Sequence, residues 1–307
     1  DPHSDLTSHD TFSSGVPHNT FARLRNEDPI HWTDYKEGKG FWSITRHHDI
    51  AKMIGNTKVF TSEQGIRMED QTHEEYLARR TFQEIDGTGH RNSRMKVAKA
   101  FSGPVIIEFE EKIRSLCSDI LDNTLPMIDF DATKHIAREL PMRMLGRILG
   151  LPEEDLPWLV EKGDALIANT DPDFTDHVLD KLDTNEFRLM PHNSPAGAEL
   201  YEYAETLMEK RLKTDNTNSI LHMVMQPAVD GSKLSETEFK NFFCQLVAAG
   251  NDTTRYSIAA GIHALCHQPE LLKQMKNEPT VWETAPDEIV RWASPVNYFR
   301  RTATKDF

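Results

Sequence analysis

Cysteine is scarce in this sequence, with three residues among 307: Cys117, Cys244 and Cys266. A small domain held together by disulfides carries a denser set of cysteines, in even number. All three lie within stretches of helical periodicity. The sequence therefore indicates no disulfide framework, and we expect reduced thiols packed in a core.

Long hydrophobic runs are absent as well. No stretch of about eighteen apolar residues is present to span a bilayer, and the first residues, DPHSDLTSHDTF, lack the apolar centre of a signal peptide. A hydrophobic content of 38% and a charged content of 27% are typical of a globular protein in water. The sequence thus favours a cytoplasmic protein with no membrane anchor.

Positive charge is also in short supply. Against 49 Asp and Glu residues stand 35 Lys and Arg residues, for a net charge of −14. Phosphate backbones bind basic surfaces, so this net charge argues against nucleic acid as a partner. An acidic protein can still have a local basic patch. The length allows one large domain or two ordinary ones, with a sizeable core in either case.

What the sequence does contain is a long helix pattern over residues 239–267. Its apolar residues recur at the three- and four-residue spacing of one helix face. They are Phe239, Phe242, Phe243, Leu246, Val247, Ile258, Ile262 and Leu265. The pattern predicts a buried helix.

The middle of this helix is polar where a core helix is apolar, at Gly250, Asn251, Asp252, Thr253 and Thr254. Two interpretations stay open on local grounds. A buried acid beside a hydroxyl that bonds the backbone one turn back suits proton delivery into a closed pocket. Alternatively, Gly250 ends one helix and Asp252 caps the next, which starts at Thr253.

The string Ala249-Gly250-Asn251-Asp252-Thr253-Thr254 resembles the [AG]-G-x-[DE]-T-[TS] signature in the long central helix of the cytochromes P450, the haem-thiolate monooxygenases. The resemblance favours the proton-delivery interpretation. It implies catalytic roles for Asp252 and Thr253, cofactor contacts at Ala249 and Gly250, and a substrate-pocket position for Ala248.

A second motif is the glycine-rich turn at residues 86–89, which leads into a helix with His90 and Arg94 four residues apart on one face. The spacing alone is more typical of a solvated helix start. The stretch is similar to the P450 pattern D-P-P-x-H-x-x-x-R, whose His and Arg bind haem propionates. Gly87 and Thr88 replace both prolines, which puts the geometry of the turn in question.

A third motif is Glu288 with Arg291, three residues apart on a helix that Thr284 is expected to cap and that Ser294-Pro295 ends. Spacing alone is compatible with a surface ion pair of little energetic weight. The pair resembles the P450 E-x-x-R, a buried structural pair. In the strand expected over residues 295–303, the resemblance implies that Arg301 binds a propionate and that Asn297 and Phe299 line the substrate pocket.

The remaining elements are read from periodicity. We expect a short helix at 17–26, a hairpin from 31–33 and 41–45, a helix at 46–54, an irregular segment over 55–86 with a short helix near 73–82, and an almost entirely helical stretch at 104–211 with a loop over 169–195. The segment over 55–86 could be a binding loop or a disordered surface excursion, and the P450 resemblance favours the binding loop. The predicted fold is mainly α with a small β component, one P450-like domain over 1–307.

The resemblance implies haem b as cofactor, O2 as co-substrate, and a soluble ferredoxin with its reductase as electron donors. The P450 loop F-G-x-G-x-x-x-C, which supplies the iron-ligating thiolate, does not occur in the sequence. We expect that ligand C-terminal to Phe307 in a longer protein, since a chain that stops there should not be a competent monooxygenase. The rival is a truncated product without catalytic activity.

The expected reaction is insertion of one oxygen atom into an unactivated C–H bond of a hydrophobic aliphatic substrate, such as a sterol side chain, a terpenoid or an alkane. Two alternatives from other classes are a helical binding or scaffold protein without haem, and a zinc hydrolase built on His263 and His267. The second lacks the glutamate after the first histidine that a metalloprotease helix uses as base.

Overall fold

The computed structural model describes residues 5–13, 15–35, 38–168, 171, 185–211, 220–228 and 230–307. The chain forms two compact units. The smaller one comprises Asp1–Tyr76, Gln83–Thr88 and Phe299–Phe307, and the larger one comprises Leu77–Phe82 and Gly89–Tyr298. The single domain expected over 1–307 stays a prediction.

The smaller unit contains the predicted hairpin. Strands β1 (Ile30–Thr33) and β2 (Phe41–Ile44) pair antiparallel, with Trp32 opposite Trp42 and their rings 5.1 Å apart edge to face. Gly40 has a φ of 72°, and a Cβ there would lie 2.6 Å from the Trp32 ring, so only glycine fits this turn. Helices α1 (His9–Ser13), α2 (His18–Glu27) and α3 (His47–Ile54) complete this part, and the last two confirm predictions.

A second ladder in this unit joins distant parts of the sequence. Strand β3 (Phe60–Thr61) pairs antiparallel with β4 (Thr302–Ala303). The sequence predicted β4 as part of a longer strand over 295–303 and did not predict β3, because two residues show no alternation of apolar and polar side chains. Helix α4 (His73–Arg79) and the 3₁₀ turn η2 (Phe82–Glu84) follow β3.

The larger unit is helical, as predicted for residues 104–211. Its elements in chain order are α5 (Gly87–Val97), which begins in the smaller unit, η3 (Ala98–Phe101), α6 (Gly103–Ile107), α7 (Glu110–Thr124), the π-helical turn η4 (Thr133–Ala137), α8 (Glu139–Leu149), η5 (Glu153–Asp155), α9 (Leu156–Ile167), η6 (Asn185–Phe187), η7 (Pro191–Asn193), α10 (Pro195–Arg211), α11 (Ile220–Met225), α12 (Glu236–His267), α13 (Pro269–Asn277), η8 (Pro279–Glu283) and α14 (Ala285–Ala293). Most of the loop expected over 169–195 lies outside the described residues.

Helix α12 is one unbroken helix of 32 residues. It starts at a capping box in which the Ser235 hydroxyl accepts from the Glu238 N–H and the Glu238 carboxylate accepts from the Ser235 N–H. The polar residues in its middle do not interrupt it. The interpretation that Gly250 ends one helix and Asp252 caps another is therefore wrong.

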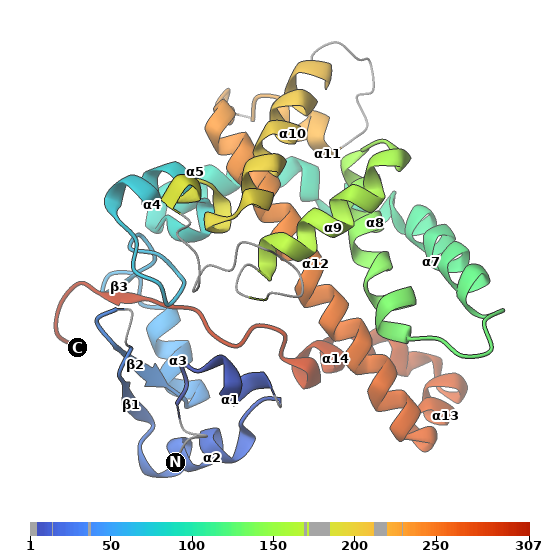
Figure 1. The fold of residues 1–307 in the computed structure, drawn as a ribbon, viewed down its shortest axis with the longest axis horizontal. Coiled ribbons are helices and arrows are strands. Elements are labelled where there is room, and N and C mark those ends of the chain that lie inside the picture. The colour runs from blue at the N-terminus through green and yellow to red at the C-terminus, as the bar shows by residue number, and fades with distance from the viewer. Residues whose placement is uncertain are drawn as a thin grey trace. The chain divides into compact units, whose positions relative to one another are not determined.

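Four helices, α8, α9, α10 and α14, pack against α12, which crosses the larger unit diagonally in Figure 1. The core between them contains Leu156, Leu159, Leu200, Phe239, Phe243 and Val247, all with side chains at most 1% exposed. Of these residues, Phe239, Phe243 and Val247 belong to the apolar stripe predicted over residues 239–267. Burying such side chains drives the helices together, at about 25 cal/mol for each Å² of apolar surface removed from water.

The three cysteines differ in their surroundings. Cys244 is buried in this core, and burial raises the pKa of its thiol to about 12. Cys117 is partly exposed, and Cys266 is exposed. All three are free thiols, as expected, but the prediction of a core position is wrong for Cys266.

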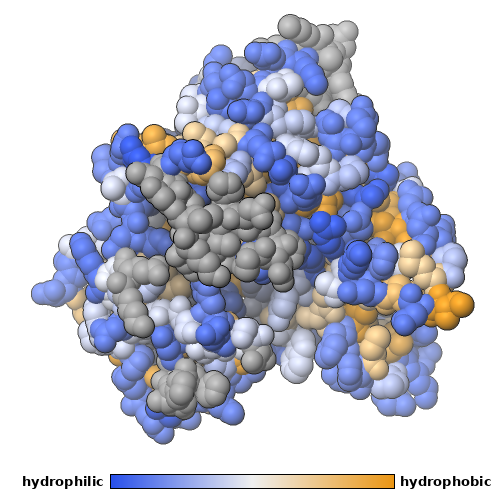
Figure 2. Space-filling view, viewed as in Figure 1, coloured by the Kyte–Doolittle hydropathy of each residue, from blue (hydrophilic) through white to orange (hydrophobic). Residues whose placement is uncertain are grey.

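The mainly α fold with a small β component is confirmed by these elements. The visible face is mostly hydrophilic, and apolar residues gather near the end of α7, where Leu121, Leu125, Met127 and Ile128 are exposed (Figure 2). Among the helices within the described ranges, none is both long enough and apolar enough to cross a bilayer.

Candidate functional site

The centre of α12 presents the two residues predicted to be catalytic, and they have different hydrogen-bond partners. The Thr253 hydroxyl donates to the Ala249 carbonyl one turn back, at 3.0 Å. The Asp252 carboxylate accepts instead from Arg255, one turn ahead. Both side chains are partly exposed. Ala249, one turn before Thr253 on the same helix, is exposed. This stretch of α12 thus offers a hydroxyl, an acid and a small side chain on accessible surface.

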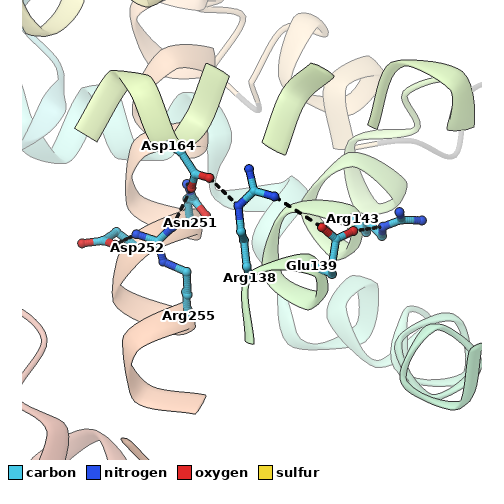
Figure 3. A network of polar contacts seen from close by, with 7 residues as sticks. All are labelled: Arg138, Glu139, Arg143, Asp164, Asn251, Asp252 and Arg255. Carbon is cyan, nitrogen blue, oxygen red and sulfur yellow. Dashed lines mark hydrogen bonds and ion pairs between the residues drawn. The ribbon is translucent and has the colours of Figure 1, made fainter. Parts of the chain in front are cut away.

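Arg255 connects Asp252 to a buried carboxylate on α9. Its guanidinium donates to Asp164 Oδ1 at 2.6 Å, and the Asp164 side chain is 2% exposed. Asn251 Nδ2 donates to the same oxygen at 2.9 Å, and Arg138 Nε donates to the other oxygen at 2.7 Å. Figure 3 shows Asp164 between the two arginines, with Arg138 continuing to Glu139. A buried carboxylate is costly to fold unless it is hydrogen-bonded, and these donors satisfy both of its oxygens.

Helix α5 holds the second motif. It begins at Gly87 with a φ of 57°, which the fixed ring of proline cannot adopt, so this chain makes the turn differently from the D-P-P pattern. The preceding Asp86 accepts from the Thr61 hydroxyl at 2.5 Å and from the Ser62 N–H at 3.1 Å. The helix with His90 and Arg94 on one face therefore forms although both prolines are replaced.

His90 and Arg94 are available in different degrees. His90 Nδ1 lies 2.6 Å from the Phe82 carbonyl, and the Phe82 ring in turn contacts Phe242 of α12, at 6.0 Å between centroids. A ring whose Nδ1 donates keeps Nε2 for another partner. Arg94 is exposed and has no hydrogen bond or ion pair to any residue within the described ranges. Arg94 can thus bind a carboxylate as it stands, and His90 can do so through Nε2 when its ring is doubly protonated.

In the smaller unit, neighbouring arginines have opposite roles. The Arg300 guanidinium donates to the carbonyls of Gln64 and Met68 and to Asp70 Oδ1, at 2.5, 3.0 and 2.9 Å, which fixes the loop after β3. Among the described residues, Arg301 donates to the carbonyl of Arg300 alone, at 2.8 Å. Most of its donors have no partner in this part of the chain, as its predicted role requires.

Glu288 and Arg291 pair as their spacing predicts, with two hydrogen bonds of 2.6 and 2.7 Å. The hydrogen bond from Arg291 lowers the pKa of Glu288. Their side chains are 61% and 66% exposed, so the expectation of a buried pair is wrong for this structure. Thr284 precedes α14 as predicted, but its hydroxyl bonds the Val281 carbonyl rather than capping the helix.

The other predicted residues are more scattered. Gly250 points toward α8, where an added Cβ would lie 3.2 Å from Leu145, so its lack of a side chain serves helix packing. Ala248 is partly buried and packs against the core. Asn297 and Phe299 are exposed and belong to different units. Their pocket roles stay predictions.

The positions of His263 and His267 do not support the zinc hydrolase alternative. His267 Nδ1 lies 2.9 Å from the His263 carbonyl, and the two rings are 4.2 Å apart. Within the described part of the chain, no three His, Cys, Asp or Glu side chains converge to hold a metal ion. A zinc site needs three or four such ligands.

Comparison with known proteins bears on these motifs. No protein-family model matches the sequence. The steroid C26-monooxygenase of Mycolicibacterium smegmatis is 31% identical over 302 residues, covering 95% of this chain and 67% of that protein. The methyl-branched lipid omega-hydroxylase of Mycobacterium tuberculosis is 31% identical over 299 residues, covering 93% of this chain and 66% of that protein.

Among solved structures, cytochrome P450 CYP268A2 of Mycobacterium marinum in complex with pseudoionone matches with a TM-score of 0.82. Its sequence is 29% identical, and the match covers 99% of this chain and 72% of that one. This chain belongs to the cytochrome P450 family. It is thus a haem-dependent monooxygenase by family, with haem b as cofactor and O2 as co-substrate.

The residues of this P450 fit a haem in their chemistry. Haem carries two carboxylates on a flat apolar ring, and the exposed Arg94 has donors without a partner among the described residues. On α12, the exposed Ala249 has no side-chain atom beyond Cβ, so a flat group can approach the helix there. The unpartnered guanidinium and the small residue are the two features of the chain that support the fit.

Sequence reasoning missed Arg138, Asp164 and Arg255. Arg255 lies three residues after Asp252, a spacing that places two side chains on one helix face and could have revealed this pair. Asp164 gave no such signal, because it lies 91 positions from Arg255 and sits in a stripe read as apolar core.

Proposed function

We propose that this cytochrome P450 inserts one oxygen atom from O2 into an unactivated C–H bond of a hydrophobic aliphatic substrate. The substrate class is that of sterol side chains, terpenoids and alkane-like or fatty lipids. The observation that carries the proposal is the relationship, at 31% identity each, to proteins named steroid C26-monooxygenase and methyl-branched lipid omega-hydroxylase. The acid and hydroxyl on α12 supply the proton chemistry that such a reaction needs.

Three residues are proposed to bind the haem carboxylates: His90 and Arg94 on α5, and Arg301 before β4. The support is chemical, since the guanidinium groups of Arg94 and Arg301 keep donors that bond no other group among the described residues. His90 would donate through Nε2 when its ring is doubly protonated, because Nδ1 faces the Phe82 carbonyl. Ala249 and the backbone of Gly250 would contact the flat ring. Glu288 and Arg291 would keep a structural role, tested by the haem content of Glu288→Gln and Arg291→Gln variants.

Bound haem would supply the activation of O2: with two electrons from the reductant and two protons, one oxygen atom enters the C–H bond and the other leaves as water. The residues of α12 would manage the two protons. Rotation about its Cα–Cβ bond would turn the Thr253 hydroxyl away from the Ala249 carbonyl, so that it could donate a hydrogen bond at the site of reaction. Asp252, partly exposed to water, would take protons from solvent and pass them inward.

The proposed substrate pocket includes Ala248, Asn297 and Phe299. A small and an aromatic side chain suit an apolar ligand, and an amide can orient a single polar group. Electrons are proposed to come from a separate ferredoxin and its reductase, and the protein is proposed to act in the cytoplasm.

A binding experiment tests the substrate class. The haem-loaded protein, expressed from its complete reading frame, is titrated with a sterol, a branched alkane and a terpenoid, and with a polar aromatic acid as control. The aliphatic ligands are expected to displace water from the haem and shift its Soret band at micromolar concentration. A shift with the polar acid alone would contradict the substrate class, and protein without haem would favour the scaffold alternative.

A further inference from the structure

Asp252, Arg255 and Asp164 form a chain of charges in which burial rises steeply from one end to the other. The Asp252 side chain is 39% exposed, that of Arg255 19%, and that of Asp164 2%. One guanidinium therefore bridges a solvated carboxylate on α12 and a buried carboxylate on α9 (Figure 3). Breaking the ion pair therefore has a different energetic cost at Asp252 than at Asp164.

The Asp164 end cannot open readily. Releasing Arg255 would leave a buried carboxylate with Arg138 and Asn251 as its remaining partners, and the lost interaction could not be replaced by water. The Asp252 end can open, because water reaches that carboxylate and can replace the guanidinium. Arg255 is thus anchored at α9 and holds Asp252 reversibly.

The ion pair with Arg255 also directs the Asp252 carboxylate away from Thr253. Thr253 donates to the Ala249 carbonyl, and the interactions of Asp252 within the described residues run to Arg255 and not to Thr253. We propose that Arg255, anchored on Asp164, is a positioning residue for Asp252: it sets the orientation from which this acid turns to deliver protons. The proposal rests on the proposed role of Asp252 in the P450 reaction.

Replacement of Arg255 by lysine separates anchoring from positioning. In the native side chain, Nη1 bonds Asp164 while Nη2 bonds Asp252. A lysine has one compact ammonium in place of this fork, and we expect that ammonium to pair with the buried Asp164. Asp252 then loses its partner. Arg255→Gln loses both contacts. Arg143→Gln is the matched control, since Arg143 pairs with Glu139 of the same network and is not bonded to Asp252.

The first readout is unfolding in urea, which needs no turnover. The unfolding equilibrium constant is expected to rise on the order of a hundredfold in Arg255→Gln, because the buried Asp164 loses one of the two guanidinium groups that pair with it. In Arg255→Lys it should rise by less than about tenfold, since the buried contact is kept. Equal losses in both variants would contradict the assignment of Asp164 as the anchor.

The second readout is the turnover rate of the haem-loaded protein in a double-mutant cycle. Asp252→Asn is expected to slow turnover by about a hundredfold or more. Arg255→Lys should slow it by about threefold or more in the wild-type background and add nothing in the Asp252→Asn background, because it acts only through that carboxylate. Arg143→Gln should leave the rate unchanged.

The outcomes separate two kinds of failure. A normal rate in Arg255→Lys, or an equal slowing in both backgrounds, overturns the positioning role while leaving the proposed function intact. A normal rate in Asp252→Asn overturns the proposed role of Asp252, and the positioning role with it. A rate that simply follows stability across the Arg255 variants would reduce Arg255 to a link between α9 and α12.

Discussion

Thr253 and Asp252 are adjacent in the sequence, yet α12 sends their side chains to different partners. The hydroxyl returns to its own helix at Ala249, and the carboxylate is drawn to Arg255. An unbroken helix separates neighbouring side chains by about 100° around its axis, so such a division follows from the continuity of α12. This division is compatible with the separate roles that we propose for the two residues.

Substitution at Thr253 tests its step. Thr253→Ala is expected to leave substrate binding nearly unchanged while most reductant is consumed without hydroxylated product and hydrogen peroxide is released, because no hydroxyl remains to bond the bound O2. The measurement compares reductant consumed, peroxide released and product formed. Thr253→Ser, which keeps the hydroxyl, should retain most of the wild-type ratio of product to reductant.

A wild-type ratio in Thr253→Ala would remove the hydroxyl from the mechanism. Its role would then be limited to the hydrogen bond with the Ala249 carbonyl, which local sequence reasoning also allowed.

Residues that act within one helix were predictable from spacing, and residues that act across helices were not. His90 with Arg94 and Glu288 with Arg291 share helix faces, as the sequence indicated. The exposure of Glu288 was not predictable, because spacing says nothing about what covers a face. The buried Asp164 looked like an interruption of a core stripe, and only the fold brings it to Arg255.

At the scale of elements, the close crossing of α9 over α12 depends on Gly163. A Cβ there would lie 3.0 Å from Asn251 Nδ2 and 3.1 Å from the Met142 methyl. Gly163→Ala is therefore expected to push the helices apart and to destabilise the protein by about 1–3 kcal/mol, as overpacked cores do. Urea unfolding measures this.

The control for this substitution is Gly103→Ala, at the start of α6, where an added Cβ has no atom within 4 Å. It is expected to leave the free energy of unfolding unchanged or slightly higher, because alanine favours helix. An equal loss in both variants would mean that the α9–α12 contact is not the cause.

The start of α12 gives the protein a pH-dependent contribution to stability. Burial raises the pKa of Glu238, but the hydrogen bonds from the Ser235 N–H and from Lys96 outweigh it and bring the pKa below its ordinary value of 4.5. A carboxyl whose folded-state pKa is lowered stabilises the fold above the unfolded-state pKa and loses that effect as the pH falls through the folded-state value.

Glu238→Gln is accordingly expected to lower the free energy of unfolding at pH 7 and to converge with the wild type as the pH falls from 4.5 through the lowered folded-state pKa of Glu238. Urea unfolding at a series of pH values measures the difference. Glu236→Gln, on the same exposed turn but outside the capping box, serves as control. A difference that stays constant down to acid pH would contradict the role of the ionised Glu238.

Elements with sustained periodicity were predicted well, and those built by distant pairing were not. The helices from α7 to α10 and α12 follow apolar stripes that are visible in the sequence. Strands β3 and β4 have two residues each and are held by a partner more than two hundred positions away. The continuity of α12 through Gly250 was undecidable locally, because packing against Leu145 outweighs the low helix propensity of glycine.

At the scale of the whole molecule, the family explains features that no single element does. An acid and a hydroxyl lie in the middle of the long helix α12, and Arg94 on α5 has no hydrogen bond or ion pair among the described residues. The interactions within the chain give these residues no shared purpose. The proposed haem would, because its carboxylates suit a guanidinium and the oxygen chemistry that it supports consumes protons.

The most direct test of this account is the visible spectrum of the protein expressed from its complete reading frame, reduced and exposed to carbon monoxide. The account predicts stoichiometric haem and the red-shifted Soret band of a thiolate-ligated iron. Arg94→Ala should lower the haem content, whereas Arg91→Ala, three residues earlier on α5 and also exposed, should not. Protein that purifies without haem, or a spectrum typical of histidine ligation, would contradict the account.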